Sequence, residues 1–222
     1  MTDRLRRVRW ALAQWMERNH YGSQDIESIL DNDPGTILEH FFDVSEEDFA
    51  GENVLVIGSG AGIAHTLDVG DGRVVGIDPL NTELTNAMAD SNADLVAGVG
   101  EFLPFTDDSF TVVVSTNVLD HCADPSQVVE EVRRVLTEDG RFLLELNVFE
   151  LPKPLRKGLT VVDLPHPHHF DADGVVRLVE EAGFEVTADK HQRPTDPDRN
   201  LKLRTATDGF RLRRYSLQAT TA

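Results

Sequence analysis

The glycine-rich segment GSGAG, residues 58–62, is the first feature of this sequence that could hold a ligand. It follows the apolar run VLVI and opens a predicted helix, so its backbone amides lie near a helix N-terminus, which attracts polar groups. Glycines also allow a ligand to lie directly against the main chain. Asp78 ends the next apolar run, where a carboxylate can accept both hydroxyl groups of a ribose. Together these two features predict a nucleoside-binding site.

Two alternatives bear on this nucleoside site. Asp78 could instead cap a helix that begins at Pro79. The ligand could also be a dinucleotide, but such sites favour the spacing G-x-G-x-x-G, and Ile63 stands where the third glycine would fall. No arginine follows Asp78 to bind a 2′-phosphate. The pattern therefore favours a nucleoside and disfavours a Rossmann-type oxidoreductase.

Four histidines form a second group with possible chemistry: His121, His166, His168 and His169. An ordinary imidazole has a pKa near 6.5, which suits proton acceptance at neutral pH. The segment 166–169, with Asp163 and Asp171 nearby, also offers metal ligands, but its spacing matches no structural zinc pattern. We rank a substrate-binding loop first, structural hydrogen bonding second and a metal site third, so no metal ligand is assigned. Cys122 is expected to be a small buried residue rather than a nucleophile.

Strands and helices that could position these residues alternate from residue 53 onward. The predicted strands are 54–57, 73–78, 94–97, 110–116 and 141–148, and the predicted helices are 61–68, 81–89, 125–136 and 171–182. This alternation predicts an α/β fold with a Rossmann-like, doubly wound, mostly parallel sheet. Two further runs, 184–191 and 210–218, predict an antiparallel pair at the sheet edge. We expect Asn117, Asp120, His121 and the 166–169 loop to converge beside the glycine turn, where ligands bind in such sheets.

The first 52 residues have a different pattern. Apolar residues at helical spacing predict a helix over residues 5–16, and the stretches 25–30 and 36–42 predict short helices. We therefore expect an N-terminal helical extension, a cap formed by residues 1–52, on a ligand-binding domain formed by residues 53–222.

Three segments resemble the class I S-adenosylmethionine-dependent methyltransferases. They are VLVIGSGAG (54–62), VVGIDP (74–79) and the run from LPFTDDSF to FLLEL (103–146). Among these enzymes the sequence is most similar to the type 11 methyltransferase domain, and the segment FDADGVVRLVEEAGFEV extends the similarity to residue 186. The resemblance implies S-adenosyl-L-methionine as the cofactor and makes residues 53–222 the methyltransferase domain.

The resemblance also implies a role for individual residues. Residues expected at the cofactor are Gly58, Ser59, Gly60, Gly62, Asp78, Pro79, Glu101, Phe102 and Asn117. Asp120 and His121 would lie at the mouth of the active site. The sequence departs from the family pattern at Val56 and Val99, where the family often has acidic residues. Each departure removes a hydrogen-bond acceptor, worth about 1.5–3 kcal/mol toward a charged group.

The implied reaction is an in-line methyl transfer to a small-molecule or to a lipid- or sugar-linked acceptor. The donor is already activated, so the protein mainly aligns the reactants and excludes water. A general base is needed only where the acceptor carries a proton, and our candidates for catalytic residues are His121, His166 and His169. The alternative is a non-catalytic regulator of the same fold that binds S-adenosylmethionine or a nucleoside.

The composition limits the partners. The net charge is −18, with 39 acidic and 21 basic residues, which argues against nucleic acid as the substrate. Only 4 of the basic residues are lysines and 23 of the acidic ones are aspartates, a balance that resembles salt-adapted proteins. Both termini are basic and could make a weak contact with an acidic surface. The single cysteine and the lack of an apolar signal or membrane segment predict a cytoplasmic protein.

Overall fold

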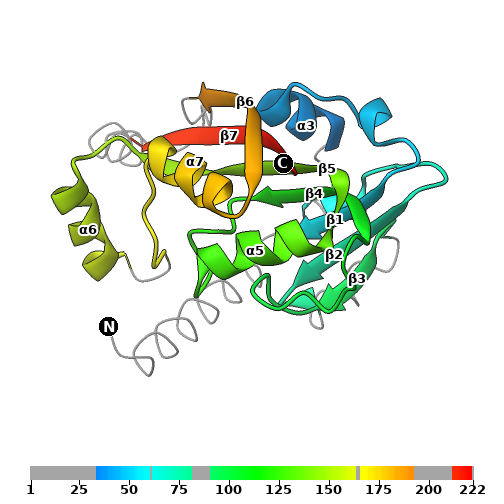
Figure 1. Cartoon of the computed structure of the whole chain (residues 1–222), viewed down its shortest axis with the longest axis horizontal. Helices are drawn as coiled ribbons and strands as arrows, with labels where there is room; N and C mark the ends of the chain where they lie inside the picture. Colours follow the sequence, from blue (N-terminus) through cyan, green and yellow to red (C-terminus); the bar gives the residue numbers. More distant parts are fainter. Residues whose placement is uncertain (1–33, 61, 82–90, 164–165, 193–211, 222) are drawn as a thin grey trace.

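A computed structural model describes residues 34–60, 62–81, 91–163, 166–192 and 212–221 (Figure 1). The helices are α3 (Pro34–Phe42), α5 (Pro125–Val135), α6 (Lys153–Val162) and α7 (Ala172–Glu181), with short 3-10 helices η1 (Glu46–Phe49) and η2 (Ile63–His65). The strands are β1 (Asn53–Ile57), β2 (Arg73–Asp78), β3 (Asp94–Ala97), β4 (Phe110–Thr116), β5 (Leu136–Phe149), β6 (Phe184–Gln192) and β7 (Leu212–Thr221). None of the helices in these ranges has the length and apolar character needed to span a bilayer.

The seven strands form one sheet in the order β3-β2-β1-β4-β5-β7-β6. Strands β3, β2, β1, β4 and β5 are parallel neighbours, while β7 pairs antiparallel with both β5 and β6. This confirms the predicted doubly wound sheet with an antiparallel edge. The chain runs outward from β1 in one direction and from β4 in the other, so the reversal of strand order lies between β1 and β4. Ligands of open α/β sheets bind at that reversal, beyond the carboxyl ends of the strands.

Apolar strands bury both faces of this sheet. In β1, Val54 and Val56 pack in one hydrophobic cluster and Leu55 and Ile57 in the other, as the alternation of side chains along a strand requires. The first cluster includes Leu38 and Phe42 of α3, and the second includes the apolar stripe of α5 and residues of α7. The helices therefore cover opposite faces of the sheet, and the carboxyl edge is left to the loops.

The helices agree with the expected positions in part. Asp171 caps α7 through a hydrogen bond from the Gly174 amide, and α5 begins at Pro125, as predicted. The expected helix over 61–68 is only the short η2, and the segment after β5, expected to be loop, contains α6. Residues 1–33 and 82–90 lie outside the described residues, and with them the helices expected over 5–16, 25–30 and most of 81–89.

Candidate functional site

The glycine turn leaves the carboxyl end of β1 at the reversal of strand order. Gly58 and Gly60 have φ angles of 69° and 40°, in the left-handed region that glycine adopts without strain. A Cβ atom added to Gly58 would lie 2.2 Å from Cγ2 of Val118, a residue of the loop after β4. Glycine at this position therefore allows the turn and the loop after β4 to lie against each other.

Asp78 at the end of β2 is hydrogen-bonded to the glycine turn. Its Oδ2 accepts from the Gly60 amide at 3.2 Å, and its Oδ1 accepts from the Leu80 amide at 2.7 Å. The second bond turns the chain immediately after the strand. The carboxylate is thus oriented at the same edge as the turn, in the place where a ribose-binding acid is expected.

His65 is hydrogen-bonded to the glycine turn, and sequence analysis did not identify it as a site residue. Its Nε2 lies 2.5 Å from the Gly60 carbonyl oxygen and its Nδ1 lies 3.0 Å from Oγ of Ser91. Burial lowers the pKa of His65, against the hydrogen bond to Gly60 and the charge of Asp78, which raise it. A neutral imidazole at this position holds the turn without adding a charge to the site.

Asn81 is a second supporting residue that sequence reasoning missed. Its side-chain nitrogen donates to the carbonyl oxygens of Gly76 at 3.0 Å and Val96 at 2.9 Å, and its Oδ1 accepts from Oγ of Ser59 at 3.3 Å. Asn81 is 1% exposed and Ser59 is equally buried. One side chain therefore connects β2, β3 and the glycine turn.

In the loop after β3, the two residues that sequence analysis placed at the adenine, Glu101 and Phe102, differ in their exposure. Glu101 is buried, and its Oε1 accepts from the amides of Ala123 at 2.7 Å and Asp124 at 3.2 Å. Its carboxylate thereby holds the chain just before α5. Phe102 beside it is 75% exposed, and it is one of two large exposed apolar side chains among the described residues.

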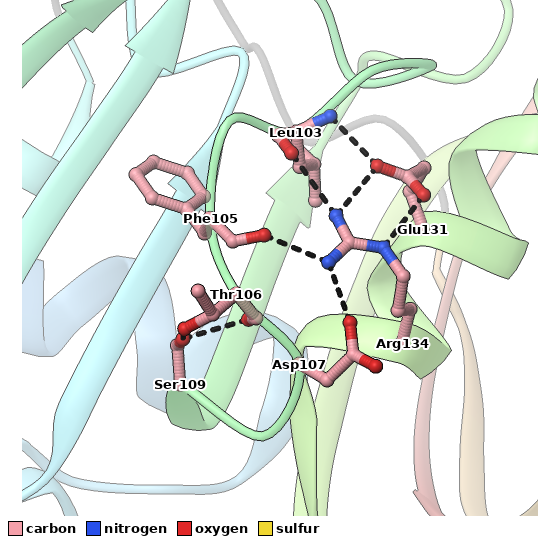
Figure 2. Close-up of polar contacts among 7 residues, drawn as sticks. All are labelled: Leu103, Phe105, Thr106, Asp107, Ser109, Glu131 and Arg134. Atoms are coloured by element: carbon pink, nitrogen blue, oxygen red, sulfur yellow. Dashed lines mark hydrogen bonds and ion pairs between the residues drawn. The ribbon is translucent and has the colours of Figure 1, made fainter.

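Arg134 of α5 holds the rest of this loop (Figure 2). Its guanidinium donates to the carbonyl oxygens of Leu103 at 3.0 Å and Phe105 at 2.7 Å, and to the carboxylates of Asp107 and Glu131. Glu131 in turn accepts from the Leu103 amide at 2.8 Å. Hydrogen bonds to Glu131 and Asp107 raise the pKa of Arg134, so the guanidinium stays charged. We call these five residues the Arg134 clamp.

The loop after β4 starts with Asn117, which has a φ of 57°, a conformation that asparagine tolerates better than most residues. Its amide donates to the Glu145 carbonyl at 2.8 Å, and its Oδ1 accepts from the side chain of Asn147 at 2.6 Å. Asp120, three residues later, is 3% exposed. Burial raises the pKa of Glu145, opposed by Arg214, and the nearby charge of Asp120 raises it further. The buried carboxylates of Asp120 and Glu145 thus lie close enough for their charges to interact.

The histidines meet at the same loop, as sequence analysis expects. The rings of His121 and His166 lie 4.5 Å apart between centroids. His166 Nδ1 lies 2.8 Å from Oδ1 of Asp163, and His169 Nε2 lies 3.1 Å from Oδ2. Burial raises the pKa of Asp163, but the hydrogen bonds and charges of His166 and His169 outweigh it and leave that pKa well below its usual value.

His168 differs from the other three histidines. Its amide donates to the Asp120 carbonyl at 3.3 Å, which joins the two loops. Burial lowers the pKa of its imidazole, while hydrogen bonds with the backbone at Ala123 and Cys122 raise it. The His168 imidazole therefore interacts with the main chain at Ala123 and Cys122. Burial also raises the pKa of the Cys122 thiol, as expected of an unreactive, packed cysteine.

These features fit S-adenosylmethionine in part. The left-handed glycine turn and the oriented Asp78 carboxylate lie at the strand reversal, and the exposed Phe102 ring follows β3 at the same edge. Val56, where the family often has an acidic residue, is buried in the hydrophobic core and offers no hydrogen-bond acceptor. The nucleoside half of the site is thus better formed than the part that would bind the amino group.

Comparison with known proteins identifies a methyltransferase domain in this chain. Residues 55–144 match the family model described as a methyltransferase domain. An uncharacterized methyltransferase of Bacillus subtilis is 38% identical over 104 residues, 43% of this chain and 40% of that protein. A probable S-adenosylmethionine-dependent methyltransferase of Mycolicibacterium smegmatis is 34% identical over 140 residues, 62% of this chain and 53% of that protein. The chain thus spans about half or less of these two relatives.

The fold is shared with solved methyltransferases. The geranyl diphosphate C-methyltransferase of Streptomyces coelicolor, crystallised with Mg2+, geranyl diphosphate and S-adenosyl-L-homocysteine, superposes with a TM-score of 0.65 at 12% identity. The superposition covers 84% of this chain and 80% of that one. Residues 55–144 thus match a methyltransferase domain, and the chain shares the fold of solved S-adenosylmethionine-dependent methyltransferases.

Proposed function

We propose that this protein transfers the methyl group of S-adenosyl-L-methionine to a small acceptor, either free or linked to a lipid or sugar. The observation that carries the proposal is the convergence of the glycine turn, Asp78 and the loop after β4 at one edge of the sheet. When bound there, the cofactor supplies a methyl group on a sulfonium, which an aligned acceptor can take directly. The solved geranyl diphosphate enzyme, which shares the fold, supports a small molecule as the acceptor class.

The cofactor would lie along the edge from β3 to β4. Asp78 would accept the ribose hydroxyls, and Gly58, Ser59, Gly60 and Gly62 would line the methionine part. Pro79 and Phe102 would contact the adenine, and the exposed ring of Phe102 supports this role. Glu101 would act through its hydrogen bonds to the chain before α5, and Asn117 would face the reacting methyl group.

The acceptor would lie on the other side of Asn117, among His121, His166 and His169. We assign these three residues to the acceptor and its proton, because Asp163 is hydrogen-bonded to His166 and His169, and the ring of His121 lies 4.5 Å from that of His166. We propose that residues 1–52 form an N-terminal cap on the ligand-binding domain, residues 53–222. We also propose that the protein acts in the cytoplasm, which its single cysteine favours.

Calorimetry with S-adenosylhomocysteine tests the cofactor assignment. Wild-type protein should bind it, and Asp78→Ala should abolish measurable binding because the ribose loses its acceptor. Asp78→Asn keeps the size of the side chain and removes its charge, so it tests whether binding needs the charge. Asp94→Ala is the matched control, since Asp94 is an exposed carboxylate at the opposite end of the neighbouring strand β3. Tighter binding of NADH, or unchanged binding after Asp78→Ala in a folded protein, would overturn the assignment.

A further inference from the structure

Three side chains from two loops form a cluster that can hold a metal ion. Asp120 and His121 follow β4, and His166 lies in the segment between α6 and α7. Each offers one ligand atom, and the three atoms lie within 4.8 Å of one another. We propose that Asp120, His121 and His166 bind a divalent transition-metal ion beside the methyl-transfer site. Sequence analysis ranked a metal third because it considered only the 166–169 segment with Asp163 and Asp171.

The buried carboxylate of Asp120 is the first argument for a cation. Its Oδ1 is buried and has no hydrogen-bond partner among the described residues. Among the described residues, the structure pairs this oxygen with Nε2 of His121 at 3.9 Å, which is too long for a hydrogen bond. A buried carboxylate oxygen is costly without a partner, and metal coordination is one of the ways in which proteins compensate such a charge. The carboxylate is thus placed as a ligand would be.

Asp163 supplies the second argument, because it orients His166 as metal-binding histidines are oriented. A histidine that binds a metal through one ring nitrogen usually donates the other N–H to a carboxylate or carbonyl. Oδ1 of Asp163 lies 2.8 Å from Nδ1 of His166. An ionised carboxylate only accepts hydrogen bonds, so this contact puts the proton on Nδ1 and the lone pair on Nε2. That tautomer is the one that coordinates a metal through Nε2.

The ligand set indicates the kind of ion and what it would do. Two imidazoles and one carboxylate suit Zn2+, Mn2+ or Fe2+ better than Ca2+. Bonds of about 2.0–2.2 Å require the ligand atoms to approach each other by roughly 1 Å, which side-chain rotation in two loops can supply. Three protein ligands leave coordination positions open for an acceptor oxygen, and a bound metal lowers the pKa of such an oxygen acid.

This inference rests on the proposed methyl transfer and names its substrate class. The acceptor would carry a hydroxyl or carboxylate oxygen that binds the ion. His121 and His166 would then act on the acceptor through the metal rather than as bases.

Metal binding can be measured without cofactor or acceptor. Tag-free full-length protein, dialysed against a chelator, is titrated with Zn2+ by calorimetry and with Co2+ by visible absorption. One ion should bind per chain, and the Co2+ spectrum should show nitrogen and oxygen ligands. His166→Ala and Asp120→Asn should each weaken binding at least about 100-fold, and Asp163→Asn about 10- to 100-fold, as outer-shell changes do. His166 is the safer variant, since its side chain is 35% exposed and is not part of the core.

The matched control is His191→Ala. His191 lies 3.8 Å from Asp189 in an exposed His–Asp pair on β6, and this variant should bind Zn2+ as the wild type does. Absence of stoichiometric binding, or equal binding by wild type and His166→Ala, would overturn the metal site. S-adenosylhomocysteine binding measured on the same samples keeps the two proposals apart: its loss with Zn2+ binding intact contradicts the methyltransferase assignment, and the reverse result contradicts only the metal.

Discussion

Asn81 is the side chain that ties the glycine turn to the two strands beside it. Asn81→Ala would leave the buried carbonyl oxygen of Gly76 and the partly buried one of Val96 without its donors. An unsatisfied buried polar group costs about 1–3 kcal/mol, so we expect a loss of that size in the free energy of unfolding. Urea denaturation measures it, and S-adenosylhomocysteine affinity should fall as well because Ser59 loses its support.

Asn92→Ala provides the control for Asn81, because Asn92 is exposed and lies close by in sequence. It should change stability by less than about 0.5 kcal/mol. If Asn81→Ala were as stable as the Asn92 variant, the connection between the turn and the strands would be dispensable.

The residues of the site differ in how far the sequence revealed them. Gly58, Gly60 and Asp78 were predictable because each owes its role to the local chain, as a left-handed turn or a strand end. His65 and Asn81 were not, because each acts through a tertiary contact that no local pattern encodes. Their partners become visible only when neighbouring strands are aligned.

At the scale of elements, the Arg134 clamp fixes the loop that joins β3 to β4. Arg134→Ala removes the donors to Leu103 and Phe105 together with the ion pairs to Asp107 and Glu131. Since the side chain is 31% exposed, solvent screens part of the interaction, and we expect a loss of about 2 kcal/mol in unfolding free energy. Hydrogen exchange over residues 103–109 should accelerate more than elsewhere.

Arg133→Ala, one position earlier on the same helix, is the control and should leave exchange in the loop unchanged. Arg134→Lys should restore only part of the stability, because lysine lacks the planar fork that binds several acceptors at once. Full recovery with lysine would mean that charge alone, rather than the geometry in Figure 2, holds the loop.

The clamp also gives a pH dependence. The hydrogen bond from Arg134, which outweighs burial, lowers the pKa of Glu131 from its ordinary value of 4.5. A lowered carboxyl pKa contributes stability that is complete above the ordinary value and is lost as the pH falls through the lowered one. The stability difference between wild type and Arg134→Ala should therefore be constant near neutral pH and shrink below pH 4.5. Urea titrations at several pH values test this, and a gap that widens in acid would contradict it.

Elements were predictable where hydrophobic periodicity decided them. The apolar strands and the apolar face of α5 pack against each other in one core. The spacing of their apolar residues therefore predicts both the type of element and the face that it buries. Helix α6 was missed because Gly158 interrupts its pattern and prolines precede it, although proline suits the first turn of a helix. In the segment after the glycine turn, η2 replaces the expected helix where His65 bonds back to Gly60. Tertiary contacts there outweigh local propensity.

At the scale of the whole molecule, strand order explains why a distributed set of residues forms one site. The glycine turn, Asp78, Asn117 and the histidine loop are separated by up to about a hundred residues in the chain, yet each follows the carboxyl end of a strand of the same sheet. A hydrogen bond of 2.8 Å from the Phe149 amide to the Phe170 carbonyl closes the base of the long segment after β5. This closure returns His166 and His169 to the edge where β4 ends.

The net charge of −18 belongs to the molecule as a whole and gives the last prediction. Carboxylates that face few lysines repel one another when salt is scarce, because the Debye length grows from about 3 Å at 1 M to about 30 Å at 0.01 M. The melting temperature should therefore rise markedly between dilute buffer and molar KCl. NaCl should act equally, since screening depends on ionic strength, whereas specific cation sites among the aspartates would separate the two salts. A melting temperature that stays constant over this range would contradict salt adaptation, and with it the halophilic origin suggested by the aspartate-rich, lysine-poor composition.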